Sequence, residues 1–121
     1  MQGTRVLVVE DHPQAAEMLT MLLEGWGCAV RVAHTGKEAI DEASHGPVDV
    51  ILCDLNLPDT SGIDLLPRLK NLQSCSEAVA VSLSGKGGPN AEARSREAGF
   101  RKHLVKPAPF HELKRVLRIA P

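Results

Sequence analysis

Residues that could do chemistry follow four of the five short apolar runs in the sequence. Glu10 and Asp11 follow the first run, Asp54 the third, Ser84 the fourth and Lys106 the fifth. Three neighbouring carboxylates repel one another unless a cation joins them, and hard oxygen ligands at a small open site suit Mg²⁺. A metal, a carboxylate, a hydroxyl and a lysine together are the groups needed to transfer a phosphoryl group to a carboxylate.

The elements that would position these residues can be read from the alternation of patterns. Five runs rich in Val and Leu are predicted to be strands, at 5–9, 28–33, 48–53, 78–83 and 102–105. Between and after them lie five stretches of helical length, at 13 to Gly25 or Gly27, 35–46, 63–72, 90–98 and 110–119. Alternating strands and helices predict a parallel sheet covered by helices on both faces.

The second and third helices carry local signals for their shape. Thr35 is expected to cap the second helix, which should close at Gly46, and Pro67 should kink or shorten the third. In an open sheet of this kind, ligands bind outside the carboxyl ends of the strands. If the strand order is 2-1-3-4-5, Asp54 lies beside the acidic pair, where it would attack as the nucleophile and form an aspartyl phosphate.

Composition limits the size and the class of the protein. The chain has 121 residues, of which 43% are hydrophobic, and this is enough for one compact domain over residues 1–121. Its few aromatic residues argue against stacking platforms for bases or sugars. Three cysteines without a C-x-x-C pair do not indicate a disulfide framework or a zinc site. Because the sequence shows no signal peptide and no apolar run long enough to span a membrane, we expect a cytoplasmic domain without membrane contact.

Charge is unevenly distributed along the chain. Residues 1–83 hold 5 Lys and Arg against 12 Asp and Glu, whereas residues 84–121 hold 9 against 3. A basic segment can indicate nucleic acid, but no recognition motif accompanies it. The charge is therefore interpreted as a docking surface or a solvated helix face, without direct nucleic-acid binding.

Four motifs in order make the sequence resemble the receiver domain of two-component signalling over essentially its whole length. They are "VVEDH", "CDLNLPDTSG" with its D-x-x-x-P-x-x-x-G spacing, "SLSG" and "HLVKP". The intervals of 30 residues from Asp54 to Ser84 and of 22 from Ser84 to Lys106 match as well. The resemblance implies a flavodoxin-like (βα)5 three-layer sandwich with a five-stranded parallel sheet of order 2-1-3-4-5.

The resemblance also assigns roles to the residues of the site. Asp54 becomes the phosphorylation site, assisted by Ser84 and Lys106. Mg²⁺ would be held by Glu10, Asp11, Asp54 and the Asn56 backbone carbonyl, with Asp11 as a direct ligand.

Further positions match the family in part. Ser84 and His103 would form the switch, although His103 stands where relatives usually have Tyr or Phe. Asn56 and Lys86 resemble positions that tune the lifetime of the phosphoryl group, and the Lys106–Pro107 bond is expected to be cis. His12 is not expected to be a metal ligand, because only a softer metal would need an imidazole next to Asp11. The remaining histidines, His34, His45 and His111, are expected to be surface residues.

Partners follow from the resemblance. The phosphodonor would be a histidine kinase or a histidine phosphotransfer domain, and the chain would be no enzyme beyond assisting its own phosphorylation and dephosphorylation. Phosphorylation would shift the face made by the fourth helix, fifth strand and fifth helix, where an acidic partner or a second receiver could dock. That face carries Arg94, Arg96, Arg101, Lys102, Lys114, Arg115 and Arg118.

The sequence leaves the setting of the domain open. It fits a stand-alone receiver or one cut from a larger protein, and it looks most like the receivers of hybrid sensor histidine kinases. The alternatives are a receiver-fold adaptor that is not phosphorylated, a haloacid-dehalogenase-like phosphatase, and a flavodoxin-like nucleotide or flavin binder. Against the phosphatase, Asn56 and Pro58 replace the acid and the threonine of its D-x-D-x-T pattern; against the binder, "EDHPQ" presents negative charge to a phosphate.

Overall fold

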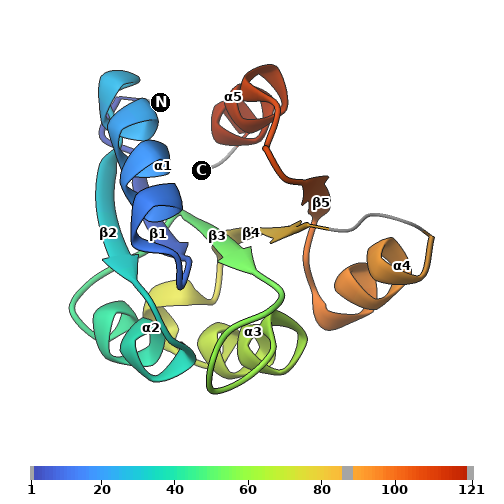
Figure 1. Cartoon of the computed structure of the whole chain (residues 1–121). Helices are drawn as coiled ribbons and strands as arrows, with labels where there is room; N and C mark the ends of the chain where they lie inside the picture. The colour runs from blue at the N-terminus through green and yellow to red at the C-terminus, as the bar shows by residue number, and fades with distance from the viewer. Residues whose placement is uncertain (1, 86–88, 120–121) are drawn as a thin grey trace.

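Five strands and five α-helices alternate along the chain in the computed structural model, which describes residues 2–85 and 89–119 (Figure 1). The strands are β1 (Arg5–Val9), β2 (Ala29–Ala33), β3 (Val50–Asp54), β4 (Val79–Ser84) and β5 (Lys102–Val105). The helices are α1 (Pro13–Gly25), α2 (Gly36–Ala43), α3 (Gly62–Lys70), α4 (Pro89–Ala98) and α5 (Phe110–Ile119), with a 3₁₀ turn, η1 (Gln73–Cys75), after α3.

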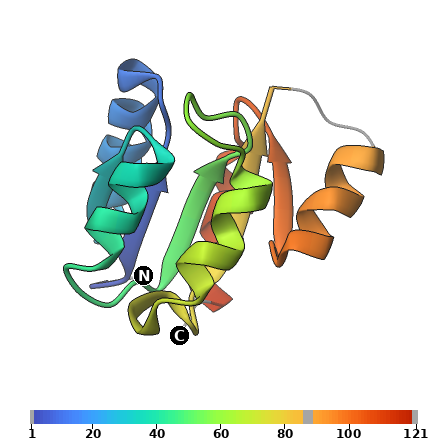
Figure 2. The ribbon, with the colours of Figure 1, turned by 90° about the horizontal axis from the view of Figure 1, so that it is seen from below.

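The strands form one parallel sheet of order β2-β1-β3-β4-β5, which confirms the predicted topology. Helices α1 and α5 cover one face, and α2, α3 and α4 cover the other; Figure 2 shows the second set in front of the sheet. Because the sheet is covered on both faces, its central strand β3 is apolar up to its last residue, Asp54. All five residues of β3 are buried, Asp54 included.

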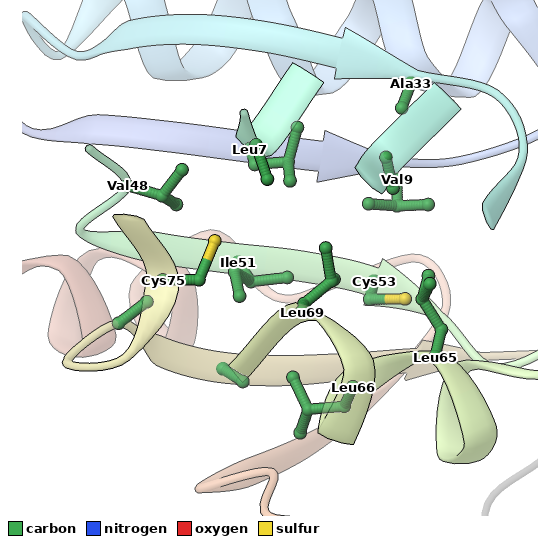
Figure 3. Packing of buried hydrophobic residues seen from close by; sticks show 14 of the residues in the cluster. Leu7, Val9, Ala33, Val48, Ile51, Cys53, Leu65, Leu66, Leu69 and Cys75 are labelled. Carbon is green, nitrogen blue, oxygen red and sulfur yellow. The ribbon is translucent and has the colours of Figure 1, made fainter. Parts of the chain in front are cut away.

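The buried apolar residues form a separate cluster on each face of the sheet. On the face of α2 and α3, Ile51 and Cys53 of β3 lie against Leu65, Leu66 and Leu69 of α3 (Figure 3). On the opposite face, alternate residues of the same strands pack with side chains of α1 and α5, such as Leu23 and Leu113. The two clusters hold the carboxyl ends of the strands rigidly at one edge of the sheet.

Several boundaries differ from those expected. The third and fourth strands each start and end one or two residues later than predicted, and α2 ends at Ala43 instead of Gly46. The reason at β3 is that the backbone N–H of Val48 donates to Ser74 and that of Asp49 donates to Arg5, both outside the strand pairing. Asp54 therefore belongs to the strand itself, with Leu83 as its pairing partner.

Helix ends follow the local sequence. Thr35 caps α2 as predicted, since its hydroxyl accepts a hydrogen bond from the Glu38 backbone N–H. Helix α3 runs through Pro67 and ends three residues later, two residues short of the predicted end. At the C-terminal end of α1, Trp26 lies beneath α5, where the Lys114 ammonium is 5.1 Å from the centre of its ring.

None of the helices within residues 2–85 and 89–119 has the length and apolar character needed to cross a membrane. Cys28, Cys53 and Cys75 are all buried. The Lys106–Pro107 peptide bond is cis, as expected.

Candidate functional site

The carboxyl ends of β1, β3 and β5 bring Glu10, Asp54 and Lys106 into direct contact. The Lys106 ammonium lies 2.6 Å from Glu10 Oε1 and 2.7 Å from Asp54 Oδ2, and it donates to both. Glu10 is completely buried and Asp54 is 4% exposed. One cation thus joins two buried carboxylates that are 44 residues apart in the chain.

Asp54 is held by a second hydrogen bond from its own loop. The backbone N–H of Asn56 donates to Asp54 Oδ1 at 3.1 Å. Asn56 pairs with Ser61 in an isolated antiparallel bridge whose hydrogen bonds come from the neighbouring residues. In such a pair the N–H and C=O of one residue point to the same outer edge, so the Asn56 carbonyl is directed to the side on which Asp54 lies.

The turn after Asp54 requires a glycine at Gly62. A Cβ atom there would lie 2.7 Å from the backbone oxygen of Asp54, which is closer than real Cβ atoms come, and 3.1 Å from the Leu55 Cα, which is a tight contact. The Gly62 N–H also donates to the Leu55 carbonyl, and this closes the loop. The glycine of the D-x-x-x-P-x-x-x-G pattern therefore lets α3 begin directly against the end of β3.

Asp11 and His12 complete a group of possible metal ligands. Glu10, Asp11, His12 and Asp54 each offer a ligand atom, and these atoms all lie within 4.8 Å of one another. Asp11 Oδ1 is buried and makes no hydrogen bond among the described residues, although His12 Nδ1 is 3.2 Å away. A buried carboxylate oxygen without a hydrogen bond fits a cation ligand, and the oxygens of the three carboxylates in this group fit Mg²⁺.

The pKa values of Glu10 and Asp54 are shifted in opposite directions. Burial opposes ionisation of Glu10, but hydrogen bonds from Lys106 and from the His12 backbone N–H lower its pKa to about 2. Burial raises the pKa of Asp54 and outweighs the hydrogen bonds from Lys106 and Asn56. Burial alone would lower the pKa of Lys106, yet its two carboxylate partners raise it.

Ser84 lies at the end of β4, beside the site, but its hydroxyl faces β5. Ser84 Oγ is 3.1 Å from His103 Nε2, and the Ser84 carbonyl accepts a hydrogen bond from the Lys106 backbone N–H. His103 is half-buried, and its Nδ1 lies 2.7 Å from Ser82 Oγ. The two residues of the predicted switch are therefore in direct contact.

Some residues at the site were not expected from the sequence. His34, predicted to be a surface residue, is half-buried, and its ring contacts the Glu10 carbonyl at 2.9 Å. Asp59 accepts hydrogen bonds from the backbone N–H groups of Gly36 and Lys37 and so caps α2 from the loop after β3. His12 follows the acidic pair directly in the sequence, and this was the available signal that its ring lies beside Glu10 and Asp11. Lys86 lies outside the described residues.

Buried carboxylates and a lysine at the strand ends of a parallel α/β domain are typical of signalling domains that accept a phosphoryl group. The chain is similar in sequence and in structure to domains of this class. The sequence model of the response regulator receiver domain matches residues 6–118. The chain belongs to the response regulator receiver domain family. Receiver domains are phosphorylated by histidine kinases and generally bind Mg²⁺ at an acidic pocket.

Curated relatives are transcriptional regulators. The chain is 35% identical over 117 residues to the transcriptional regulatory protein KdpE of Mycobacterium tuberculosis, covering 97% of this chain and 50% of the relative. It is 32% identical over 115 residues to the cell cycle transcriptional regulator CtrA of Caulobacter vibrioides, covering 95% and 48%. The chain thus spans about half the length of the curated relatives that it matches.

Solved structures agree with the fold. A CheY-like receiver domain from Methylobacillus flagellatus superposes with a TM-score of 0.84 at 32% identity, covering 97% of this chain and 98% of the other. A response regulator from Burkholderia pseudomallei, with a phosphorylated aspartic acid, a calcium ion and citrate, superposes with a TM-score of 0.87 at 30% identity, covering 96% and 67%. The family, the signalling role and the fold predicted from the sequence are confirmed.

Proposed function

We propose that Asp54 is the phosphoacceptor of this receiver domain, within a single domain over residues 1–121. The observation that carries the proposal is the Lys106 ammonium, which bridges Glu10 and Asp54 next to the Asp11 oxygen that has no hydrogen bond. A carboxylate oxygen of Asp54 attacks the phosphorus of a phosphohistidine, the P–N bond breaks, and the imidazole leaves. Lys106 then shifts its hydrogen bond to an oxygen of the new acyl phosphate.

The chain supplies the ligands that Mg²⁺ requires. Asp11 and Asp54 would bind it directly together with the Asn56 carbonyl, and Glu10 would complete the charge balance. When bound, Mg²⁺ supplies positive charge to the equatorial oxygens of the transferring group. Fixing these donors on rigid strand ends is how the domain assists its own phosphorylation and, with water as the acceptor, dephosphorylation.

We propose that Ser84 and His103 change their contacts when Asp54 carries a phosphoryl group. The Ser84 hydroxyl would donate to a phosphoryl oxygen, which changes its contact with His103 and shifts the face formed by α4, β5 and α5. On this face Arg94, Arg96 and Arg101 are exposed, whereas Lys102 is paired with Glu112 at 2.8 Å. An acidic partner or a second receiver domain would dock there.

The phosphodonor would approach along the other side of the site. A groove of about 380 Å³ leads from Glu10 and Lys106 between α1 and α5 and is lined mainly by apolar side chains, among them Met18 and Phe110. Met18 is 71% exposed and Phe110 64% exposed. We propose that a histidine kinase or histidine phosphotransfer domain docks in this groove, because Lys106, which lines it, donates a hydrogen bond to Asp54. A hybrid histidine kinase as the parent protein and a cytoplasmic location stay predictions from the sequence.

Acetyl phosphate with Mg²⁺ tests the phosphoacceptor. Intact mass spectrometry should show one added phosphoryl group on the wild-type chain, lost in Asp54→Asn and lost when EDTA removes the metal. Asp59→Asn is the matched control, because Asp59 lies in the same loop but caps α2, and this variant should still be phosphorylated. No added mass, or equal added mass in Asp54→Asn, would refute the proposal and favour an adaptor that is not phosphorylated.

A further inference from the structure

Four buried or half-buried side chains form a continuous hydrogen-bonded path from the site to α4. The path runs from Ser84 through His103 and Ser82 to Ser95, with Ser82 Oγ 3.0 Å from Ser95 Oγ. Ser82 and Ser95 are 0% and 1% exposed. Ser95 lies on α4, which packs beside β5 (Figure 1). We call these four residues the serine–histidine network.

One arrangement of hydrogens fits the contacts of this network. Ser82 Oγ contacts the Lys102 carbonyl at 3.4 Å, and a carbonyl can only accept. When Ser82 directs its single hydrogen to Lys102 or to Ser95, it accepts from His103 Nδ1, which then carries the ring proton. His103 Nε2 can in this arrangement accept a hydrogen bond from the Ser84 hydroxyl, and we assign the arrangement to the domain before phosphorylation.

We propose that Ser82 and Ser95 are positioning residues that carry the phosphorylation signal from Ser84 to α4 by reversing the direction of these hydrogen bonds. The inference rests on the proposed function, in which the Ser84 hydroxyl donates to a phosphoryl oxygen. That hydroxyl has one hydrogen, so it then stops donating to His103 Nε2. The ring loses its proton at Nδ1 and gains one at Nε2 by exchange with water, and its charge is unchanged.

The new ring form changes the partners of the two buried serines. Nδ1 without a proton accepts from Ser82, and Ser82 therefore stops donating to Ser95. Ser95 must become the donor or lose the bond. Because Ser95 is almost fully buried on α4, a lost or reversed bond alters how α4 is held on β5, since an unpaired buried hydroxyl is unfavourable. A change at Asp54 thus reaches the α4 surface through polar contacts.

The test is ¹⁵N side-chain NMR of His103 in the full chain, before and after phosphorylation with acetyl phosphate and Mg²⁺. The ring should carry its proton on Nδ1 before and on Nε2 after phosphorylation. In Ser82→Ala, Nδ1 loses its close acceptor, so the Nε2 form should dominate even without phosphate. Ser74→Ala is the control, because Ser74 donates to the Ala43 carbonyl at 2.6 Å away from the network.

Ser95→Ala tests the last step of the path, and alanine favours the helical conformation of α4. Phosphorylation of the wild type should change hydrogen exchange of α4 amides by about fivefold, as expected for one hydrogen bond. Ser95→Ala should abolish this change and leave the ring form as in the wild type. An unchanged ring in protein whose mass shows the phosphoryl group, or an intact α4 response in Ser95→Ala, would overturn the inference alone. Absence of added mass would overturn the proposed function and this inference together.

Discussion

Glu10 and Asp54 share one ammonium group, yet their proton affinities move in opposite directions. Hydrogen bonds from Lys106 and His12 lower the pKa of Glu10 to about 2, whereas burial raises the pKa of Asp54. Because its folded pKa lies below the ordinary value, Glu10 stabilises the fold above that value and loses this contribution as pH falls towards 2. For Asp54 the sign is opposite, and the fold loses stability as pH rises through the raised pKa.

Removing the shared cation should raise both pKa values. In Lys106→Met, Glu10 loses its strongest charged partner and should titrate closer to its ordinary range, while Asp54 should titrate still higher. Carboxyl ¹³C NMR in EDTA measures both titrations. Lys102→Met, which removes an ammonium that pairs with Glu112 instead, should leave them unchanged. If Lys106→Met titrates like the wild type, the bridge does not control the charge at the site.

Gly62 supports the site without any side chain of its own. In Gly62→Ala, the new Cβ would meet the Asp54 backbone oxygen at 2.7 Å, so the loop or β3 must shift. We expect the rate of phosphorylation by acetyl phosphate to fall by about tenfold or more, because small displacements of a reacting group are costly. Gly25→Ala is the control, since a Cβ there meets nothing within 4 Å, and its rate should match the wild type.

Strands β1 and β3 are tied together at their amino ends by an ion pair. The Arg5 guanidinium donates to both oxygens of Asp49 at 3.0 Å, and this hydrogen bonding lowers the pKa of Asp49. Because that pKa is lower in the folded state, Asp49 stabilises the fold above its ordinary value, and the contribution disappears as pH falls through the folded value. The ion pair therefore matters at neutral pH and not in strong acid.

Asp49→Asn should accordingly be less stable than the wild type at pH 7, with the difference shrinking as the pH is lowered below the ordinary aspartate range. Urea unfolding at several pH values measures the free energy of unfolding in both proteins. Asp41→Asn, which changes an exposed aspartate on α2, should show a smaller effect at every pH. A difference that stays constant with pH would show that packing, and not charge, is responsible.

The sequence predicted the helices and strands better than it predicted the side-chain contacts between them. All ten main elements followed from local patterns, because strand burial and helix periodicity are properties of neighbouring residues, whereas the strand order followed from the resemblance to receiver domains. The meeting of Glu10, Asp54 and Lys106 also followed, since parallel strands end at one edge. Ser95 could not be found this way, because its partner Ser82 depends on how α4 lies against the sheet.

Similar limits apply to Asp59, because no sequence pattern pairs the loop after β3 with the start of α2. Ser82 gave a faint signal, as a hydroxyl between apolar residues in the middle of β4. His34 gave none, because a polar residue after an edge strand is ordinarily exposed. Side-chain contacts between the sheet and the helices depend on how the whole fold packs, and local sequence patterns do not reveal them.

At the scale of the whole molecule, metal binding and folding should be coupled. Asp11, Asp54 and Glu10 repel one another, and the Lys106 ammonium compensates part of this negative charge, so a bound cation stabilises the folded state over the unfolded chain. Mg²⁺ at about 100 times its dissociation constant should add roughly 2.7 kcal/mol to the free energy of unfolding. Thermal unfolding followed by circular dichroism, with Mg²⁺ or with EDTA, measures the shift.

Asp11→Asn should lose most of that shift, because it removes the carboxylate whose buried oxygen has no hydrogen bond among the described residues. Asp64→Asn, at an exposed position on α3, should keep it. An equal shift in Asp11→Asn and the wild type would place the cation elsewhere.

The position of Trp26 gives the protein an optical probe of its own. It is the only tryptophan in the chain, and its ring lies beneath Lys114 at the boundary between α1 and α5. A cation close to an indole ring perturbs its emission, so fluorescence excited at this single residue reports the position of α5 without any added label. Movement of the output face could then be followed in real time during phosphorylation, in the unmodified chain.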